Sequence, residues 1–205
     1  MQPDHPKSLR NPDERRARNA LLEQPHVAPL TAFVHRLRQK MGPDYGIPHF
    51  DPFDGGVGAE ILYLLEAPGP KAVQAGFISR NNPDETAKNF FLLNAEAGID
   101  RALTVSWNVV PWYIGTGSKI RSATSSDINL GIQSLSELMG LLSNLRSIVF
   151  IGAKAAKARP LVATLKPSLS MFESPHPSPL FVNNAQGNRD RIAAVLRQVA
   201  QAVAQ

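Results

Sequence analysis

The chain has 205 residues, of which 43% are hydrophobic, 19% charged and 7% aromatic, a balance typical of one folded domain and not of a disordered or fibrous chain. Its lack of cysteine excludes disulfide bridges, thiolate metal sites, cysteine-ligated iron–sulfur clusters and cysteine nucleophiles. The formal net charge is +5, and residues 110–205 contribute 10 basic against 4 acidic side chains. This excess suggests a polyanionic partner such as nucleic acid, although solvated helix surfaces produce the same counts.

The N-terminal segment is polar and is interrupted by four prolines. We therefore expect residues 1–27 to form a loosely ordered arm with one short helix over 13–23, and residues 28–205 to form a single domain. The sequence shows neither an apolar signal-peptide core nor a run of about 18 apolar residues. We expect a cytoplasmic protein that does not enter a membrane.

Helices and strands alternate along the predicted domain. Apolar residues at helical spacing predict helices over 30–41, 84–97, 127–142, 153–165 and 188–204. Short apolar runs predict strands over 61–65, 102–107, 147–151 and 168–172. Strands separated by helices imply right-handed crossovers, so the expected fold is α/β, a three-layer α/β/α sandwich around a four-stranded parallel sheet.

Polar side chains follow three of these strands. Glu66 follows the first, Asn108 the second and His176 the fourth, while the third runs through Gly152 into a helix. Ligands of open α/β sheets bind beyond the carboxyl ends of the strands. We therefore predict that a carboxylate, an amide and an imidazole meet at one edge of the sheet.

Other motifs do not predict a cofactor. The glycine-rich segment 55–58 precedes a strand, and segment 115–119 lacks the spacing of a phosphate-binding loop. The remaining histidines have no close metal-ligand spacing. We expect neither a metal nor a nucleotide cofactor.

The residues at the strand ends resemble motifs of the uracil-DNA glycosylase superfamily. The segment Leu65-Glu66-Ala67-Pro68-Gly69 resembles the first motif, G-E-A-P-G, and Trp107-Asn108-Val109-Val110 is similar to the T-N-V-V segment. The second motif, H-P-S-P-L, is matched by His176-Pro177-Ser178-Pro179-Leu180. The resemblance covers about residues 58–200.

This resemblance implies a monofunctional hydrolysis of the bond between uracil and deoxyribose, on uracil-containing DNA and by a monomer without a cofactor. Glu66 would orient or activate water, His176 would bind uracil O2, and Asn108 would read O4 and N3–H, which mismatch cytosine. Phe77 would stack on the flipped base, and Ala67, Pro68 and Gly69 of the first motif would also bind the substrate. Contacts to DNA would come from Pro177, Ser178, Pro179 and Leu180, with Leu180 entering the base stack.

The sequence departs from the family pattern at three points. Relatives with G-E-A-P-G usually hold an iron–sulfur cluster through four cysteines, so the absence of cysteine indicates a clusterless or divergent branch. Ala67 stands where the most active branch has its catalytic Asp, and Gly69 where that branch has a Tyr that excludes thymine. Glu66 can act only if the chain is already turning after the strand.

Two other functions remain open from these residues. The chain is alternatively a catalytically weak nucleic-acid-binding relative, or a glycosylase for hypoxanthine or xanthine. Taken alone, Asn108 is also compatible with a strand-end turn, and the proline-rich segment 175–179 with an ordinary surface turn.

Overall fold

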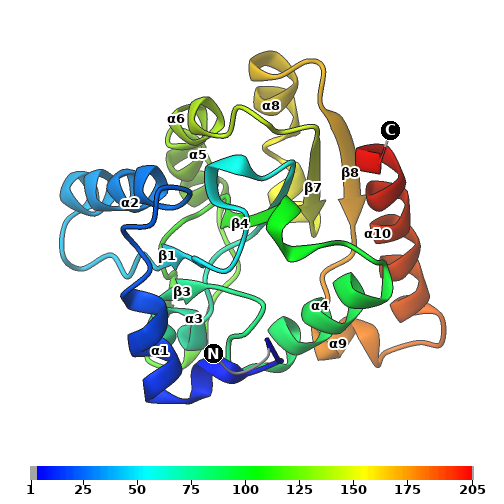
Figure 1. Ribbon diagram of the computed structural model, residues 1–205, viewed down its shortest axis with the longest axis horizontal. Coiled ribbons are helices and arrows are strands. Elements are labelled where there is room, and N and C mark those ends of the chain that lie inside the picture. The colour runs from blue at the N-terminus through cyan, green and yellow to red at the C-terminus, as the bar shows by residue number, and fades with distance from the viewer. Residues whose placement is uncertain (1–3, 205) are drawn as a thin grey trace.

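The computed structural model describes residues 4–204, so the first three residues of the predicted arm and Gln205 lie outside it. A four-stranded parallel sheet runs through the centre in the order β4-β2-β7-β8 (Figure 1). Its strands are β2 (Ile61–Leu65), β4 (Thr104–Asn108), β7 (Ser147–Ile151) and β8 (Ser170–Ser174). This confirms the predicted sheet.

Two strands start later than the sequence predicts. Residues 101–103 form the short 3-10 helix η3 (Arg101–Leu103), in which the side chain of Asp100 accepts a hydrogen bond from the Ala102 N–H. Before β8, the Leu169 N–H donates to the Lys166 carbonyl and closes a turn. Local turns therefore take up the first residues of both predicted strands.

Helices cover both faces of the sheet, as expected for the α/β/α sandwich. On one face, α4 (Glu85–Glu96) and α10 (Asn188–Ala204) pack on Ile61, Tyr63 and Val149. On the other face lie α2 (Ala28–Met41), α5 (Ser125–Ile132), α6 (Leu135–Leu141), α7 (Ala153–Ala156) and α8 (Arg159–Leu165). Successive strand residues point to opposite faces, so one short apolar strand supplies both cores.

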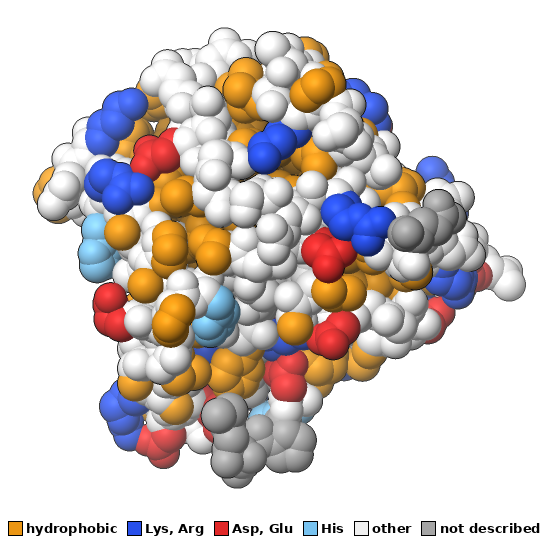
Figure 2. All heavy atoms as spheres, turned by 45° about the horizontal axis from the view of Figure 1, so that its top comes forward, with side chains coloured by type: hydrophobic (Ala, Val, Ile, Leu, Met, Phe, Trp, Pro, Cys, Tyr) orange, Lys and Arg blue, Asp and Glu red, His pale blue; other side chains and the backbone are white. Residues whose placement is uncertain are grey.

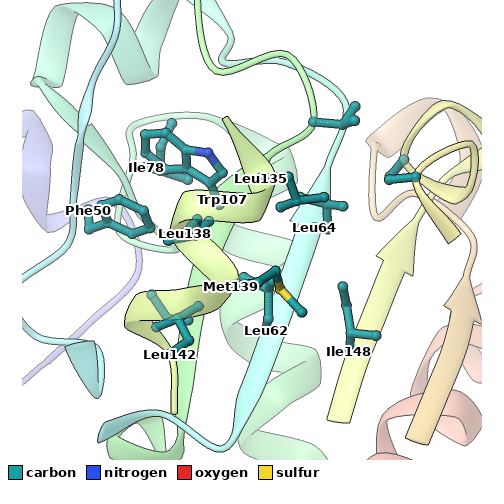
Figure 3. Close-up of a cluster of buried hydrophobic side chains, with 14 of the residues drawn as sticks. Phe50, Leu62, Leu64, Ile78, Trp107, Leu135, Leu138, Met139, Leu142 and Ile148 are labelled. Carbon is teal, nitrogen blue, oxygen red and sulfur yellow. The ribbon is translucent and has the colours of Figure 1, made fainter. Parts of the chain in front are cut away.

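The larger core lies under α2 and α6. Leu62 and Leu64 of β2 meet the side chains of α6 there (Figure 3). Trp107 stacks on Phe50 with ring centroids 4.1 Å apart. Phe50 belongs to β1 (His49–Phe50), which pairs with β3 (Phe77–Ile78) in a small separate parallel sheet.

Two predicted helices are each divided in two. The predicted helix 127–142 is interrupted between α5 and α6. In the last turn of α5, a Cβ on Gly131 would lie 2.0 Å from the Val109 carbonyl oxygen. This close approach needs glycine at that position. The predicted helix 153–165 is interrupted before α8, whose first turn contains Pro160, a residue favoured at helix starts.

Residues 4–27 pack on the rest of the chain. They form the 3-10 helix η1 (Ser8–Arg10) and helix α1 (Pro12–Asn19), which is the predicted short helix with an earlier end. Leu9 packs with Phe77 in a small apolar cluster. Arg18 is 1% exposed and forms an ion pair with the buried Asp51.

The remaining elements are short and lie mostly near the sheet's carboxyl edge: η2 (Gly56–Gly58), α3 (Pro70–Ala75), the hairpin of β5 (Gly115–Thr116) and β6 (Lys119–Ile120), and α9 (Pro179–Val182). Within residues 4–204, no helix is long and apolar enough to cross a membrane.

Candidate active site

The carboxyl ends of the central strands border a cavity of about 490 Å³. This volume lies within the range of about 300–1,000 Å³ that is usual for small-molecule sites. Seven of the predicted site residues line the cavity: Glu66, Ala67, Pro68, Gly69, Asn108, His176 and Pro177. The structure therefore brings the predicted carboxylate, amide and imidazole to one place.

Glu66 is held by the loop that follows the β5–β6 hairpin. β2 ends at Leu65, and the Val110 N–H donates to the Glu66 carbonyl at 2.9 Å. The Glu66 carboxylate oxygen Oε1 accepts hydrogen bonds from the Ala123 N–H at 2.6 Å and from the Ser122 hydroxyl at 3.2 Å. These contacts fix the carboxylate at the cavity wall.

Asn108 is the last residue of β4 and lies opposite Leu65 in the sheet register. Its side chain is almost fully buried, and its Nδ2 has no hydrogen-bond partner within residues 4–204. An unpartnered buried donor costs about 1–3 kcal/mol. A donor of this kind in a cavity wall is suited to an acceptor atom on a ligand.

His176 follows β8 and lies beside the turn that leaves β7. Gly152 makes that turn with φ +85°, a left-handed conformation that favours glycine, and a Cβ at Gly152 would lie 3.8 Å from the His176 Cβ. Burial lowers the pKa of His176, and the carboxylates of Glu66 and Asp84 offset part of this shift. The imidazole is therefore neutral at neutral pH and can donate one N–H.

The aromatic ring at the cavity is not the one that the sequence predicts. Phe77 is fully buried in β3 and packs with Leu9 and Ala75, so it does not line the cavity. Phe90 of α4 does line the cavity, and its ring packs edge-on against Tyr63 with ring centroids 4.7 Å apart. Phe90 thus serves the core and the cavity together.

The segment predicted to contact DNA, residues 177–180, begins at the cavity wall with Pro177 and reaches an exposed position at Leu180. Pro177 lines the cavity, whereas Ser178, Pro179 and Leu180 do not. Ser178 caps α9 by accepting a hydrogen bond from the Phe181 N–H at 3.3 Å. Leu180 is 84% exposed, the most exposed of the large hydrophobic side chains within residues 4–204.

Sequence reasoning missed the polar segment between β3 and α4. Ser79, Arg80, Asn82 and Asp84 all line the cavity. Asp84 also caps α4, because its side chain accepts a hydrogen bond from the Ala87 N–H at 2.9 Å. The signal in the sequence is the cluster of polar residues at 79–82 beside a strand, although the chain pattern alone does not say which way they face.

A second hollow, of about 570 Å³, lies beside the hairpin. It shares Ile120 and Arg121 with the cavity and is otherwise lined mainly by residues 112–119. None of the predicted site residues borders it.

Charge is mixed on the face shown in Figure 2, where basic and acidic side chains are interspersed among apolar ones. The net charge of +5 is therefore not gathered into one basic patch on that face. Within residues 4–204, no group of three or more His, Asp or Glu side chains is placed to hold a metal ion.

The fold and the cavity define an α/β protein with a cavity at the carboxyl edge of a parallel sheet, bordered by a carboxylate, an amide and an imidazole. A family model described as the Uracil DNA glycosylase superfamily matches residues 52–200, and the chain belongs to this superfamily. No curated protein matches the chain.

A solved structure with similarity to the chain is the solution NMR structure of a candidate uracil DNA glycosylase from Methanosarcina acetivorans. It is 20% identical, has a TM-score of 0.49, and its alignment covers 70% of this chain and 92% of the other. Membership in the superfamily rests on the family model and supports a DNA glycosylase type of function with DNA as the substrate.

Proposed function

We propose that this protein flips uracil out of DNA and hydrolyses its N-glycosidic bond, leaving an abasic site. The observation that carries the proposal is the meeting of Glu66, Asn108 and His176 at one cavity, with the buried Nδ2 of Asn108 unpartnered. An N–H donor at that place fits the O4 acceptor of uracil and mismatches the amino group of cytosine.

The transition state has positive charge on the sugar and negative charge on the departing base. Glu66 faces the sugar side, where its carboxylate stabilises the oxocarbenium-like sugar and orients the attacking water. His176 faces the base, where its neutral imidazole donates a hydrogen bond to O2 as negative charge develops. The oxygen of water forms a bond to C1′ as the bond from C1′ to N1 of the base breaks. One hydrogen of water stays on the new C1′ hydroxyl, and the other proton ends on the base, which leaves as neutral uracil.

The target base must leave the base stack of the DNA before it can enter the cavity. Leu180 is the side chain that we propose to occupy the vacated place in the stack. Its exposed side chain lies three residues beyond Pro177, which lines the cavity. An apolar side chain that enters the base stack replaces the contacts that the flipped base has lost. Phe90 takes the place of Phe77 as the aromatic side chain at the base site.

The test is the release of free uracil from single-stranded and double-stranded oligonucleotides, with abasic sites detected by alkaline cleavage. We expect release by the unaltered protein and a strong loss in Glu66→Ala and His176→Ala. Matched controls are Glu137→Ala and His35→Ala, at exposed positions away from the cavity. Absence of uracil release with protein in excess over DNA would exclude the proposal.

The alternative of a binding relative predicts salt-sensitive DNA binding that does not depend on uracil and survives Glu66→Ala. A hypoxanthine or xanthine glycosylase would release those bases from the same oligonucleotides in preference to uracil. One substrate panel therefore separates all three functions.

A further inference from the structure

Within residues 4–204, eight buried side-chain atoms have no hydrogen-bond partner, and three of them belong to residues that line the cavity. These three are Nε of Arg80, Oδ1 of Asn82 and Nδ2 of Asn108. Buried polar atoms are normally partnered, so such a concentration at one cavity requires an explanation. Ligand recognition supplies one.

The orientation of Asn82 is fixed by its own backbone contact. Its Nδ2 donates to the Phe77 carbonyl oxygen at 2.9 Å. Because a carbonyl oxygen can only accept, the nitrogen must occupy that side of the amide, and the oxygen Oδ1 takes the other. Asn82 is 4% exposed, and this Oδ1 is its unpartnered atom.

We propose that Asn82 is a specificity-determining residue whose Oδ1 accepts the ring N–H of the flipped base, while Asn108 Nδ2 donates to the neighbouring keto oxygen. The inference rests on the proposed function. The sequence assigned recognition of both O4 and N3–H to Asn108, whereas here Asn108 binds the keto oxygen and Asn82 binds the ring N–H. Two separate anchors, a strand end and a backbone carbonyl, hold the donor and the acceptor in place.

A donor next to an acceptor selects one class of base. Uracil presents O4 beside N3–H, and hypoxanthine presents O6 beside N1–H, so both offer an acceptor next to a donor. Cytosine and adenine present an amino group beside an unprotonated ring nitrogen, which reverses the two roles. The pair of asparagines therefore favours uracil over cytosine and hypoxanthine over adenine.

The test measures binding to short single-stranded oligonucleotides, which removes the cost of breaking a base pair. The probes carry one 2′-fluorinated deoxyuridine or deoxycytidine, which resist cleavage, and fluorescence anisotropy gives the ratio of the two Kd values. We expect the unaltered protein to prefer the uracil probe and Asn82→Ala to lose about tenfold of that preference, the factor expected for one hydrogen bond.

Asn94→Ala is the matched control. Asn94 is also a buried asparagine whose Nδ2 donates to a backbone carbonyl, that of Phe90, but its Oδ1 is already partnered by the Tyr63 hydroxyl. Its replacement is expected to lower the melting temperature and to leave the preference unchanged. Melting curves of each variant set the assay temperature below unfolding.

Asn82→Asp distinguishes two roles of Asn82, which are to accept the ring N–H of the base and to hold the local backbone through the Phe77 carbonyl. It keeps an acceptor oxygen but, as a carboxylate, cannot donate to the Phe77 carbonyl. Either carboxylate oxygen can accept, so we expect Asn82→Asp to retain more of the preference than Asn82→Ala, although the anchor on the Phe77 carbonyl is lost. An Asn82→Ala preference within twofold of the unaltered protein, or equal losses in both Asn82 variants, would overturn the inference.

Uracil release and base preference, measured on the unaltered protein and on Asn82→Ala, distinguish failure of the Asn82 inference from failure of the proposed function. Uracil release by the unaltered protein, together with an unchanged preference in Asn82→Ala, refutes only the role of Asn82. Absence of both uracil release and base preference in the unaltered protein refutes the two proposals together.

Discussion

Removing the carboxylate of Asp51 is expected to destabilise the protein strongly, because Asp51 pairs with the buried Arg18 and with Arg101, whose side chain is mostly shielded from solvent. Arg18 Nη1 lies 2.5 Å from each carboxylate oxygen of Asp51, and Arg101 Nη2 lies 2.6 Å from Oδ2. The Ser79 hydroxyl and the Phe53 N–H also donate to this carboxylate. Burial pulls the pKa of Asp51 up, but Arg101 and Arg18 outweigh it and hold the pKa below its usual range.

The magnitude follows from what Asp51→Ala leaves behind. Arg18 is 1% exposed and would retain a charge without its carboxylate. Breaking a buried pair by removing one partner costs about 3–5 kcal/mol. In a chain of this size each kcal/mol lowers the melting temperature by about 2–4 °C, which gives a fall of about 6–20 °C.

The assay is thermal unfolding followed by circular dichroism, with Asp13→Ala as the control. Asp13 pairs with Arg16 on the surface, where both side chains are 73% exposed, so its removal should change the melting temperature little. Asp51→Asn keeps the side-chain shape and removes the charge, and serves if the alanine variant does not fold. Equal melting temperatures for the Asp51 and Asp13 variants would refute the assigned role of the buried pair.

Four further predictions concern single side chains. Asn108→Ala should lower kcat/KM for uracil release by about tenfold to a hundredfold through loss of the donor to the base, and an unchanged steady-state rate would contradict that role. Because burial lowers the pKa of His176, the acid limb of the kcat profile should lie below pH 6.5, and His176→Ala should abolish this limb. Burial, together with the charges of Arg38 and His35, lowers the pKa of His49 to about 4. The neutral imidazole therefore contributes to the free energy of unfolding above about pH 6.5, and this contribution is lost as the pH falls toward 4. Urea midpoints measured across that interval should fall less steeply in His49→Gln, and parallel curves would exclude His49 as a source. Leu180→Ala should leave the melting temperature unchanged, because the side chain is 84% exposed. The same variant should slow uracil release from duplex DNA more than from single-stranded DNA. Equal slowing on both substrates would argue against Leu180 as a wedge.

The order of elements was predictable because short runs that contain apolar residues alternate with helical patterns; β2 and β7 are almost wholly apolar, whereas β4 and β8 are mixed. β2 and β7 have the predicted bounds, since both of their faces are buried and every residue in them is apolar or small. The carboxyl ends of parallel strands must meet at one edge, so three separate segments could be assigned to one site before any contact was known.

The breaks within helices were not predictable from periodicity. α5 and α6 share one apolar stripe, but Gly131 approaches the Val109 carbonyl, a contact between segments far apart in the sequence. The exchange of Phe77 for Phe90 has a similar cause. β3 pairs with β1, a partner of only two residues, and this pairing turns Phe77 toward Leu9 instead of the cavity.

The segment that carries Arg80 and Asn82 shows most clearly where sequence reasoning ends. Its position depends on Asp51, which accepts from Ser79, and on Arg101, which donates to Asn81 Oδ1 at 2.5 Å. Arg18 of the N-terminal segment completes this buried network. Residues from four separate parts of the chain therefore fix one wall of the cavity, and the partners of a buried charge cannot be read from local pattern. If this network places Asn82, then Asp51→Asn, assayed below its melting temperature, should weaken the preference for the uracil probe although Asp51 does not line the cavity. A preference equal to that of the unaltered protein would show that the wall keeps its shape without the network.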